Sequence, residues 1–163
     1  MEIERKFLVY KDRDFKSAAY SSSHIRQGYI PTKGVTVRIR LRDDKGFLTI
    51  KGPSVNGGLS RYEFEKEITL DEAEHLLELC DKDVIDKTRY LVRYGDHVFE
   101  VDEFHGNNEG LVMAEVELGS EEEAFERPDF IGMEVTGDRR FYNRHLRQMP
   151  FILFRGTLPI EYR

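Results

Sequence analysis

Charged and apolar residues alternate through most of the extended segments of this chain. The segment Arg38-Ile39-Arg40-Leu41-Arg42 shows the pattern most clearly. Successive side chains of a β-strand point to opposite faces, so the alternation places charges on one face and apolar groups on the other. Similar runs, rich in Val, Ile, Phe, Tyr and Thr, predict eight strands. These are Met1–Tyr10, Ser23–Ile30, Thr36–Asp43, Phe47–Gly52, Ser60–Ile68, Ile85–Tyr94, His97–Phe104 and Val112–Gly119.

Short loops rich in Gly, Pro, Asn or Asp separate these strands. Such loops join neighbouring strands as hairpins, so we expect a mainly β protein built on an antiparallel sheet or closed barrel. Three helices are expected beside it: Leu70–Cys80, a short helix from Ser120 to before Pro128, and Asp138–Met149 capped by Thr136. Residues 150–163 receive no assignment. The length of 163 residues predicts a single domain over 1–163.

Composition excludes several classes of protein. The 25 Lys and Arg residues against 31 Asp and Glu give a net charge of −6, which excludes a generally basic protein that grips nucleic acid by charge alone. Cys80 is the single cysteine, so neither a disulfide scaffold nor a thiolate zinc cluster is expected. The N-terminus has no apolar signal region and no run is long enough to span a bilayer. We therefore expect a cytoplasmic protein without nucleic-acid or membrane partners.

The charged strand faces carry as many bases as acids. An ordinary antiparallel sheet would turn such faces to water. These faces are nearly all charged, however, and the two signs are sorted by strand. Enclosing them in a barrel would be costly unless the lumen stays wet and holds a ligand. Basic walls suit a polyanion, and clustered carboxylates suit Mg²⁺ or Mn²⁺. The bases are Lys6, Arg38, Arg40, Lys51, Arg61, Lys87 and Arg89, and the acids are Glu2, Glu4, Glu63, Glu65, Asp102, Glu115 and Glu117.

An ordered set of short motifs resembles the CYTH superfamily, the triphosphate tunnel metalloenzymes. The set begins with Glu2-Ile3-Glu4-Arg5-Lys6, which matches the family's E-x-E-x-K motif. It continues with Arg26-Gln27-Gly28-Tyr29, Arg38-Ile39-Arg40, Thr49-Ile50-Lys51, Ser60-Arg61-Tyr62-Glu63-Phe64-Glu65, Lys87-Thr88-Arg89-Tyr90, Glu100-Val101-Asp102, Glu115-Val116-Glu117 and Glu134-Val135-Thr136, followed by Arg140 and Asn143. The resemblance covers residues 1–149 and is greatest to the short bacterial inorganic triphosphatases.

This resemblance implies an eight-stranded antiparallel β-barrel tunnel with a charged lumen, flanking helices and a C-terminal plug helix. The predicted helix Asp138–Met149 would be that plug. Two features depart from the family. Arg140-Phe141 stands where members often carry Arg-Tyr, and the tail 150–163 lies outside the resemblance.

The resemblance also implies roles for the charged residues. Metal ligands would be Glu2, Glu4, Asp102, Glu115 and Glu117, with Glu63 and Glu65 as further ligands or as partners that orient the bases. The triphosphate would be bound by Lys6, Arg38, Arg40, Lys51, Arg61, Lys87 and Arg89. Lys6 or Lys87 is the candidate general base, although both could serve only as phosphate ligands while a second metal activates the water. Tyr29 is either a lid over the tunnel or a packed hydrophobe.

The favoured reaction is the Mg²⁺- or Mn²⁺-dependent hydrolysis of inorganic tripolyphosphate to pyrophosphate and phosphate. Alternatives within the family are a class IV-type adenylate cyclase, a nucleoside or thiamine triphosphatase, and a long-chain polyphosphatase. A non-catalytic polyphosphate-binding module is the alternative of another class. The partner is then a small polyanion, and the protein is expected to be a monomer or a homodimer.

Overall fold

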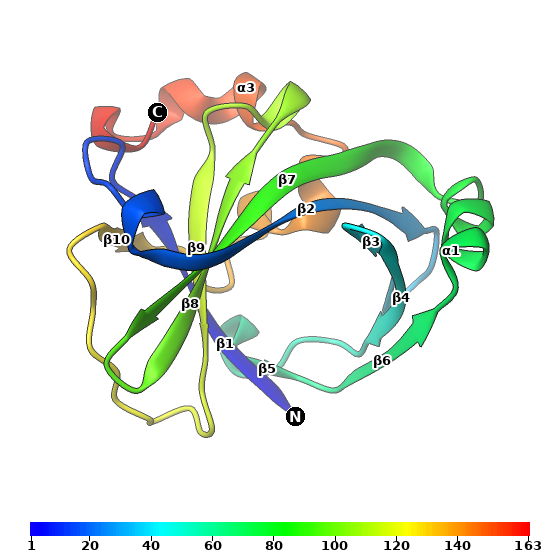
Figure 1. Cartoon of the computed structure of the whole chain (residues 1–163), viewed down its shortest axis with the longest axis horizontal. Helices are drawn as coiled ribbons and strands as arrows, with labels where there is room; N and C mark the ends of the chain where they lie inside the picture. Colours follow the sequence, from blue (N-terminus) through cyan, green and yellow to red (C-terminus); the bar gives the residue numbers. More distant parts are fainter.

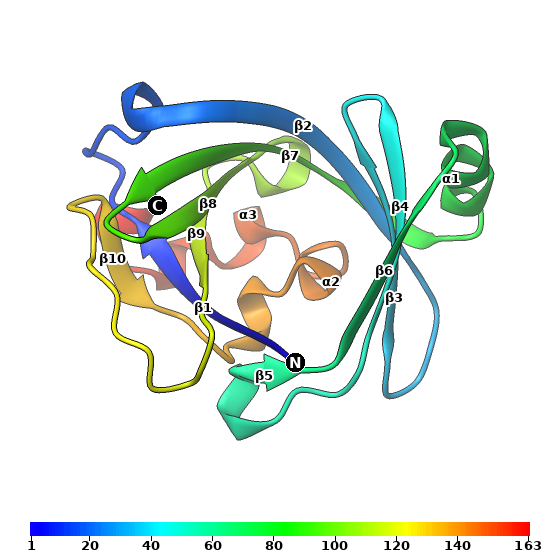
Figure 2. The ribbon, with the colours of Figure 1, turned by 60° about the horizontal axis from the view of Figure 1, so that its bottom comes forward.

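The computed structural model describes residues 1–163, apart from the side chains of Asp81 and Lys82. Ten strands form one antiparallel sheet that curls around itself (Figures 1 and 2). They are β1 (Glu2–Val9), β2 (Ala19–Ile30), β3 (Thr36–Arg42), β4 (Lys45–Lys51), β5 (Ser60–Arg61), β6 (Glu63–Ile68), β7 (Asp81–Tyr94), β8 (His97–Phe104), β9 (Val112–Glu117) and β10 (Ile131–Glu134). Their order is β10-β1-β9-β8-β7-β2-β3-β4-β6, and β5 pairs with β1.

The predicted antiparallel, mainly β class is confirmed. The strands β2 and β7 each begin four residues earlier than expected, and two further differences concern the number of strands. The expected strand Ser60–Ile68 is divided at Tyr62: β5 pairs with β1, whereas β6 pairs with β4. The strand β10 was not expected, because it is short and contains Gly132. It pairs with β1, where Phe7 lies opposite Glu134.

The helices agree less well with expectation. The helix α1 (Leu70–Leu77) begins at Thr69, whose hydroxyl accepts from the Glu72 amide in a capping box, and it packs on β3 and β4. The prediction of a helix after Ser120 is wrong, because these residues form turns and a loop. The remaining α-helices are α2 (Asn143–Leu146) and α3 (Phe151–Phe154), and the 3₁₀ turns are η1 (Lys16–Ala18), η2 (Asn56–Gly58), η3 (Gly106–Asn108), η4 (Arg139–Phe141), η5 (Arg155–Thr157) and η6 (Ile160–Tyr162). None of the described helices is long and apolar enough to cross a membrane.

The prediction of one continuous helix over Asp138–Met149 is wrong. The segment is split into η4 and α2 by Tyr142, whose backbone is extended at φ −71° and ψ 132°. Asp138, not Thr136, caps the first turn by accepting from the Arg140 amide. The Thr136 hydroxyl instead accepts from the backbone amide of Lys6.

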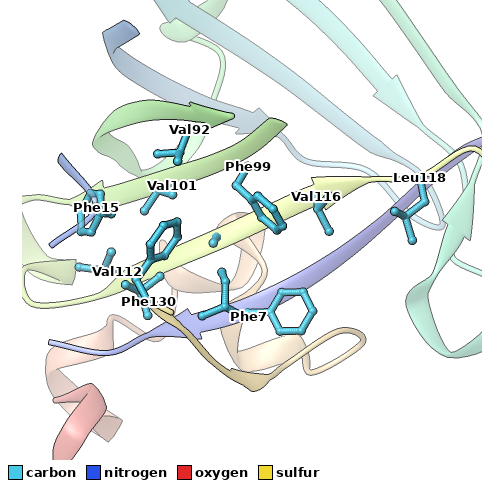
Figure 3. Close-up of a cluster of buried hydrophobic side chains, with 12 residues drawn as sticks. Phe7, Phe15, Val92, Phe99, Val101, Val112, Val116, Leu118 and Phe130 are labelled. Carbon is cyan, nitrogen blue, oxygen red and sulfur yellow. The ribbon is translucent and has the colours of Figure 1, made fainter. Parts of the chain in front are cut away.

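One hydrophobic cluster lies behind the charged face of β1, β8 and β9 (Figure 3). Phe7, Phe99, Val101 and Val116 are fully buried there and alternate with the charged residues of the same strands. This packing gives each strand a defined register, because a slip of one residue would turn the apolar side chains to the other face.

A second cluster joins the sheet to the C-terminal segment. Leu8 has the same strand parity as Lys6, and Met113 the same parity as Glu115. Both are buried, and they pack with Phe141, Phe151 and other residues of the C-terminal segment. The face that carries the charges thus becomes apolar toward one end, where residues 141–162 cover it.

Candidate active site

The charged strand faces line one cavity of about 620 Å³. Of the predicted site residues, all but Asp102 lie on its wall: Glu2, Glu4, Lys6, Tyr29, Arg38, Arg40, Lys51, Arg61, Glu63, Glu65, Lys87, Arg89, Glu115 and Glu117. The bases Lys6, Arg38, Arg40, Lys51, Lys87 and Arg89 are buried, so the ordinary arrangement with charges in bulk water does not apply to them.

The acidic wall consists of Glu2 and Glu4 on β1 and of Glu115 and Glu117 on β9. The strand register sets Glu4 opposite Glu117 and Lys6 opposite Glu115. The Lys6 ammonium lies 3.9 Å from the Glu4 carboxylate and 3.8 Å from that of Glu115. Burial, and then repulsion from Glu115, raises the pKa of Glu4 to about 7. The negative charge of Glu4 and Glu115 therefore exceeds the positive charge that Lys6 supplies.

The other acids of the wall divide into two kinds. Burial raises the pKa of Glu2 and of Glu117, and neighbouring carboxylates raise both further. Burial also opposes ionisation of Glu115, but the ammonium of Lys6 and the guanidinium of Arg89 together hold its pKa well below the ordinary value. Glu115 is thus stabilised as an anion by the protein, whereas Glu2, Glu4 and Glu117 lack sufficient positive charge.

The basic wall consists of Arg38 and Arg40 on β3 and of Lys87 and Arg89 on β7. Lys87 is 1% exposed, and its ammonium contacts the Asp102 carboxylate at 2.8 Å and donates to the Asn143 side-chain oxygen at 2.9 Å. Burial, the dominant cause, lowers the pKa of Lys87 to about 7.

Asp102 does not occupy the position expected of a metal ligand. Its two oxygens accept from Arg89 at 2.7 and 2.9 Å, and one of them also contacts Lys87. The carboxylate is 2% exposed and lies behind the cavity wall. The two cations hold its pKa below the ordinary value despite its burial. Asp102 is therefore placed to orient Lys87 and Arg89.

The remaining bases differ in how closely a carboxylate approaches them. Lys51 donates to Glu2 at 2.9 Å, and Arg61 lies 3.8 Å from the same carboxylate. Arg38 donates to Thr49 at 3.2 Å and lies 3.6 Å from Glu65, while its buried Nε has no hydrogen-bond partner among the described residues.

Glu65 accepts from the Thr49 hydroxyl at 2.9 Å, so it is placed to orient Arg38 through two contacts. Its side chain is 44% exposed at the cavity edge. This position fits the expected orienting role better than a place among the buried acids.

The C-terminal segment contributes residues that the sequence did not single out. The Lys6 ammonium lies 4.8 Å from the ring centre of Tyr142, and Asn143 accepts from Lys87. Arg144 donates to the Thr32 and Val35 carbonyls of the β2–β3 loop, so the segment carrying α2 spans the space between β1 and β3 (Figure 2). Arg139, Arg144, His145 and Gln148 also line the cavity. The sequence placed this segment at the tunnel as a plug and Asn143 in a motif, but it named none of these side chains as site residues.

Tyr29 is packed into the wall of the cavity. It is 4% exposed, its hydroxyl accepts from Gln27 at 2.8 Å, and the Arg147 guanidinium lies 5.6 Å from its ring centre. Gln27 itself was not among the expected site residues. Its amide is fully buried and also accepts from Arg40 at 2.9 Å.

The acidic wall has the donor chemistry of a site for a hard divalent cation. Carboxylate oxygens are the ligands that Mg²⁺ and Mn²⁺ prefer. Among the described residues, no three His, Cys, Asp or Glu side chains already converge as a metal cage. A cation placed among Glu2, Glu4 and Glu117 would nevertheless supply the charge that these crowded carboxylates need. The residues present therefore fit a divalent metal.

Comparisons with known proteins identify the family of this chain. The model of the CYTH domain matches residues 1–142. An inorganic triphosphatase of Acetivibrio thermocellus is 49% identical over 156 residues, which cover 94% of this chain and 97% of that protein. An inorganic triphosphatase of Nitrosomonas europaea is 38% identical over 89% of this chain and 95% of its own length. The crystal structure of the inorganic triphosphatase NE1496 superposes with a TM-score of 0.63 at 34% identity, covering 90% of this chain and 94% of that one. Because the CYTH model matches residues 1–142 and relatives of 49% and 38% identity match over most of both lengths, the chain belongs to the CYTH domain family.

Proposed function

We propose that this protein is an enzyme that hydrolyses inorganic tripolyphosphate to pyrophosphate and phosphate with Mg²⁺ or Mn²⁺. The observation that carries the proposal is the pairing of an acidic wall and a basic wall in one cavity, each with charge left uncompensated. The name of the relative that shares 49% identity over 94% of this chain supports the same reaction.

We further propose that the sheet closes into a tunnel and that residues 1–163 form one domain. Tyr62 alone separates β5 from β6, so one continuous segment pairs with β1 at one end and with β4 at the other. Counting β5 and β6 as one strand and leaving β10 outside the ring gives the expected eight strands. The packing of Phe151 and Phe154 against Leu8 and Phe104 supports including the tail in the same domain.

Glu2, Glu4, Glu115 and Glu117 would hold the metal. The bound ion would neutralise charge on the triphosphate and polarise its phosphoryl oxygens. Glu63 and Glu65 would orient bases around this site, because Glu65 contacts Arg38 and Thr49. Asp102 would position Lys87 and Arg89 from behind the wall.

The basic residues would bind the phosphoryl groups. Arg38 and Arg40 offer planar guanidinium groups suited to phosphate oxygens, and Lys6, Lys51, Arg61 and Arg89 add positive charge around the same cavity. During hydrolysis, negative charge develops on the pyrophosphate that leaves. Cations fixed by the strands stabilise this charge without having to move into place.

The structure favours Lys87 over Lys6 as the general base. Lys6 lies between two carboxylates and over the Tyr142 ring, and the charges of Glu115 and Glu4 raise its pKa despite burial. Lys87 has a pKa lowered to about 7. In the proposed reaction, neutral Lys87 accepts a proton from water, the water oxygen bonds to the terminal phosphorus, and the bond from that phosphorus to the bridging oxygen of pyrophosphate breaks.

The residues that line the cavity disfavour the nucleotide and thiamine alternatives. A base or thiamine ring would need an apolar or aromatic surface. Among the described lining residues, the tyrosine rings are those of Tyr29 and Tyr142, and His145 adds an imidazole. Arg147 lies over the first ring and Lys6 over the second. The acidic wall disfavours a module that only binds polyphosphate, because carboxylates without a metal would weaken its hold on an anion.

A product assay tests this function. Tripolyphosphate, ATP, thiamine triphosphate and long-chain polyphosphate would each be incubated with Mg²⁺ or Mn²⁺. Phosphate, pyrophosphate and cyclic AMP would be measured separately. We expect equal amounts of phosphate and pyrophosphate from tripolyphosphate. Cyclic AMP from ATP as the main product would identify a cyclase instead.

A further inference from the structure

Arg40 differs from the six other bases predicted to bind the triphosphate in having no acidic partner. Each of those six has a carboxylate oxygen within 4.0 Å: the acids are Glu4 and Glu115 for Lys6, Glu65 for Arg38, Glu2 for Lys51 and Arg61, Asp102 for Lys87, and Asp102 with Glu100 for Arg89. Among the described residues, no carboxylate lies within that distance of Arg40. Arg40 is nevertheless buried on the cavity wall.

A neutral amide, that of Gln27, takes the place of the missing carboxylate. Gln27 lies directly opposite Arg40 in the β2–β3 register. Arg40 Nε donates to Gln27 Oε1 at 2.9 Å, and Gln27 Nε2 donates to the Tyr29 hydroxyl at 2.8 Å. An arginine nitrogen can only donate, so the oxygen of the amide must face Arg40. The side chain of Gln27 is 0% exposed and therefore held on both sides.

This contact fixes the guanidinium without neutralising it. A carboxylate at position 27 could accept the same hydrogen bond, but it would also cancel the charge of Arg40. Burial, followed by repulsion from Arg38 and Arg89, lowers the pKa of Arg40 to about 9, as expected for a cation that lacks a counter-charge. An anion in the cavity would provide that counter-charge.

We propose that Gln27 is a positioning residue that holds Arg40 in place while leaving its positive charge free for a phosphoryl group of the substrate. This inference rests on the proposed function, because it takes the anion to be tripolyphosphate. It goes beyond that function by assigning a role to a buried amide that does not line the cavity.

A purely structural role for Gln27 predicts the opposite ranking of two variants. Gln27→Glu keeps the size of the side chain and its bond to Arg40 Nε, whereas Gln27→Met removes both hydrogen bonds. If Gln27 only supports the fold, Gln27→Glu should be the milder change. If it keeps Arg40 uncompensated, Gln27→Glu should be the more harmful change for substrate binding and the milder one for stability.

The test measures KM, kcat and melting temperature for both variants with tripolyphosphate. We expect Gln27→Glu to raise KM at least about tenfold, as for a weakened charge-assisted contact, and to change kcat less than about threefold. Gln27→Met should raise KM less, yet melt at a lower temperature than Gln27→Glu. A KM for Gln27→Glu equal to or below that of Gln27→Met would overturn the inference.

Gln148→Glu is the matched control for added charge. Gln148 lines the cavity itself, and it lies on the C-terminal segment outside the β2–β3 pair. We expect its KM rise to be clearly smaller than that of Gln27→Glu. An equal rise would show that any carboxylate added to the cavity has this effect, and the specific role of Gln27 would be lost.

A measurement on the unmodified protein covers the case in which Gln27→Glu does not fold. With ¹⁵N-labelled arginine, the Arg40 Nε–H signal should stay protected from solvent exchange before and after addition of tripolyphosphate. The terminal Arg40 nitrogens should shift on addition. Terminal signals that do not respond would contradict the inference, even in a protein that hydrolyses tripolyphosphate. Failure of the unmodified protein to hydrolyse it would instead contradict the proposed function.

Discussion

The acidic wall and the basic wall of the cavity carry opposite charges, but both have like charges crowded together. Burial and Glu115 raise the pKa of Glu4 to about 7 on the first wall, while burial and neighbouring guanidinium groups lower the pKa of Arg40 to about 9 on the second. Each wall therefore opposes its own ionised state. One ligand can relieve both walls only if it brings a cation to the first and an anion to the second. A metal–triphosphate complex has this composition.

Other charges of the two walls are compensated more fully. Lys6 and Arg89 hold Glu115 ionised on the acidic wall, and Lys87 of the basic wall lies 2.8 Å from Asp102. These pairs show that the fold can neutralise buried charges where neutralisation is useful. The incomplete compensation of Glu4 and Arg40 is then a property of the surfaces that bind the ligand.

The largest expected effect comes from Lys87→Arg. Arginine remains protonated at working pH, so it cannot accept a proton from water. We expect kcat at alkaline pH to fall between about a hundredfold and ten-thousandfold, with KM nearly unchanged. The rate of the unmodified enzyme should rise as pH increases through the pKa of Lys87, because the base acts when deprotonated. The bound polyanion shifts this rise to higher pH than about 7, the pKa in the free protein.

Lys6→Arg sharpens this assignment. It should raise KM and leave the shape of the pH profile unchanged, since Lys6 is a charged ligand in this account. A pH profile that keeps its rise in Lys87→Arg and loses it in Lys6→Arg would reverse the two roles.

The next effect concerns the acidic wall. We expect Glu4→Gln to lower kcat/KM at least about a hundredfold, because it removes a charged oxygen ligand from the metal site. Raising the Mg²⁺ concentration should recover part of the loss. The measurement is kcat/KM for tripolyphosphate as a function of metal concentration.

Glu67→Gln is the control for this change. Glu67 is exposed on β6 and does not line the cavity. Its replacement should leave kcat/KM within about twofold of the unmodified value, as for an ordinary surface site. Equal losses in the two variants would show that the effect of Glu4→Gln is not local.

A smaller effect is expected from the identity of the substrate. The nucleoside of ATP finds a cation over each of the two tyrosine rings in the described lining of the cavity, so it adds cost without matching contacts. We expect kcat/KM for ATP to be at least about tenfold below that for tripolyphosphate. Comparable values would mean that the cavity accepts the nucleoside and would favour a nucleotide-directed enzyme.

The smallest effect is expected from Glu65→Gln. Glu65 is partly exposed and contacts Arg38 and Thr49 at the cavity edge. Its removal should change KM less than about threefold, as for an exposed ion pair. A loss as large as that in Glu4→Gln would place Glu65 among the metal ligands and extend the acidic wall onto β6.

The strands and their charged faces could be predicted because period-two alternation is a local property of the sequence. The alternation of Arg38, Ile39 and Arg40 already states which side chains share a face. Contacts between residues far apart in the sequence could not be predicted in this way. Whether Asp102 faces the cavity or the bases behind it depends on how the bulky Arg89 and Lys87 pack. Nothing in the local pattern around Asp102 reveals this.

The C-terminal segment was harder to predict for a different reason. Its residues favour a helix locally, yet the chain is extended at Tyr142, where the ring lies under Lys6 and the next residue contacts Lys87. Tertiary contacts with β1 and β7 therefore override the local preference. The buried amide of Gln27 was missed because its role depends on the absence of a carboxylate beside Arg40, which only the assembled sheet reveals.

The most direct test of the account is the metal dependence of tripolyphosphate hydrolysis by the unmodified protein. Phosphate release would be followed in EDTA and again after excess Mg²⁺ or Mn²⁺ is restored. The account predicts that EDTA abolishes turnover and that either metal restores it, because the acidic wall acts through a divalent cation. Full activity in EDTA would contradict the claim that the two walls bind a metal and a triphosphate together.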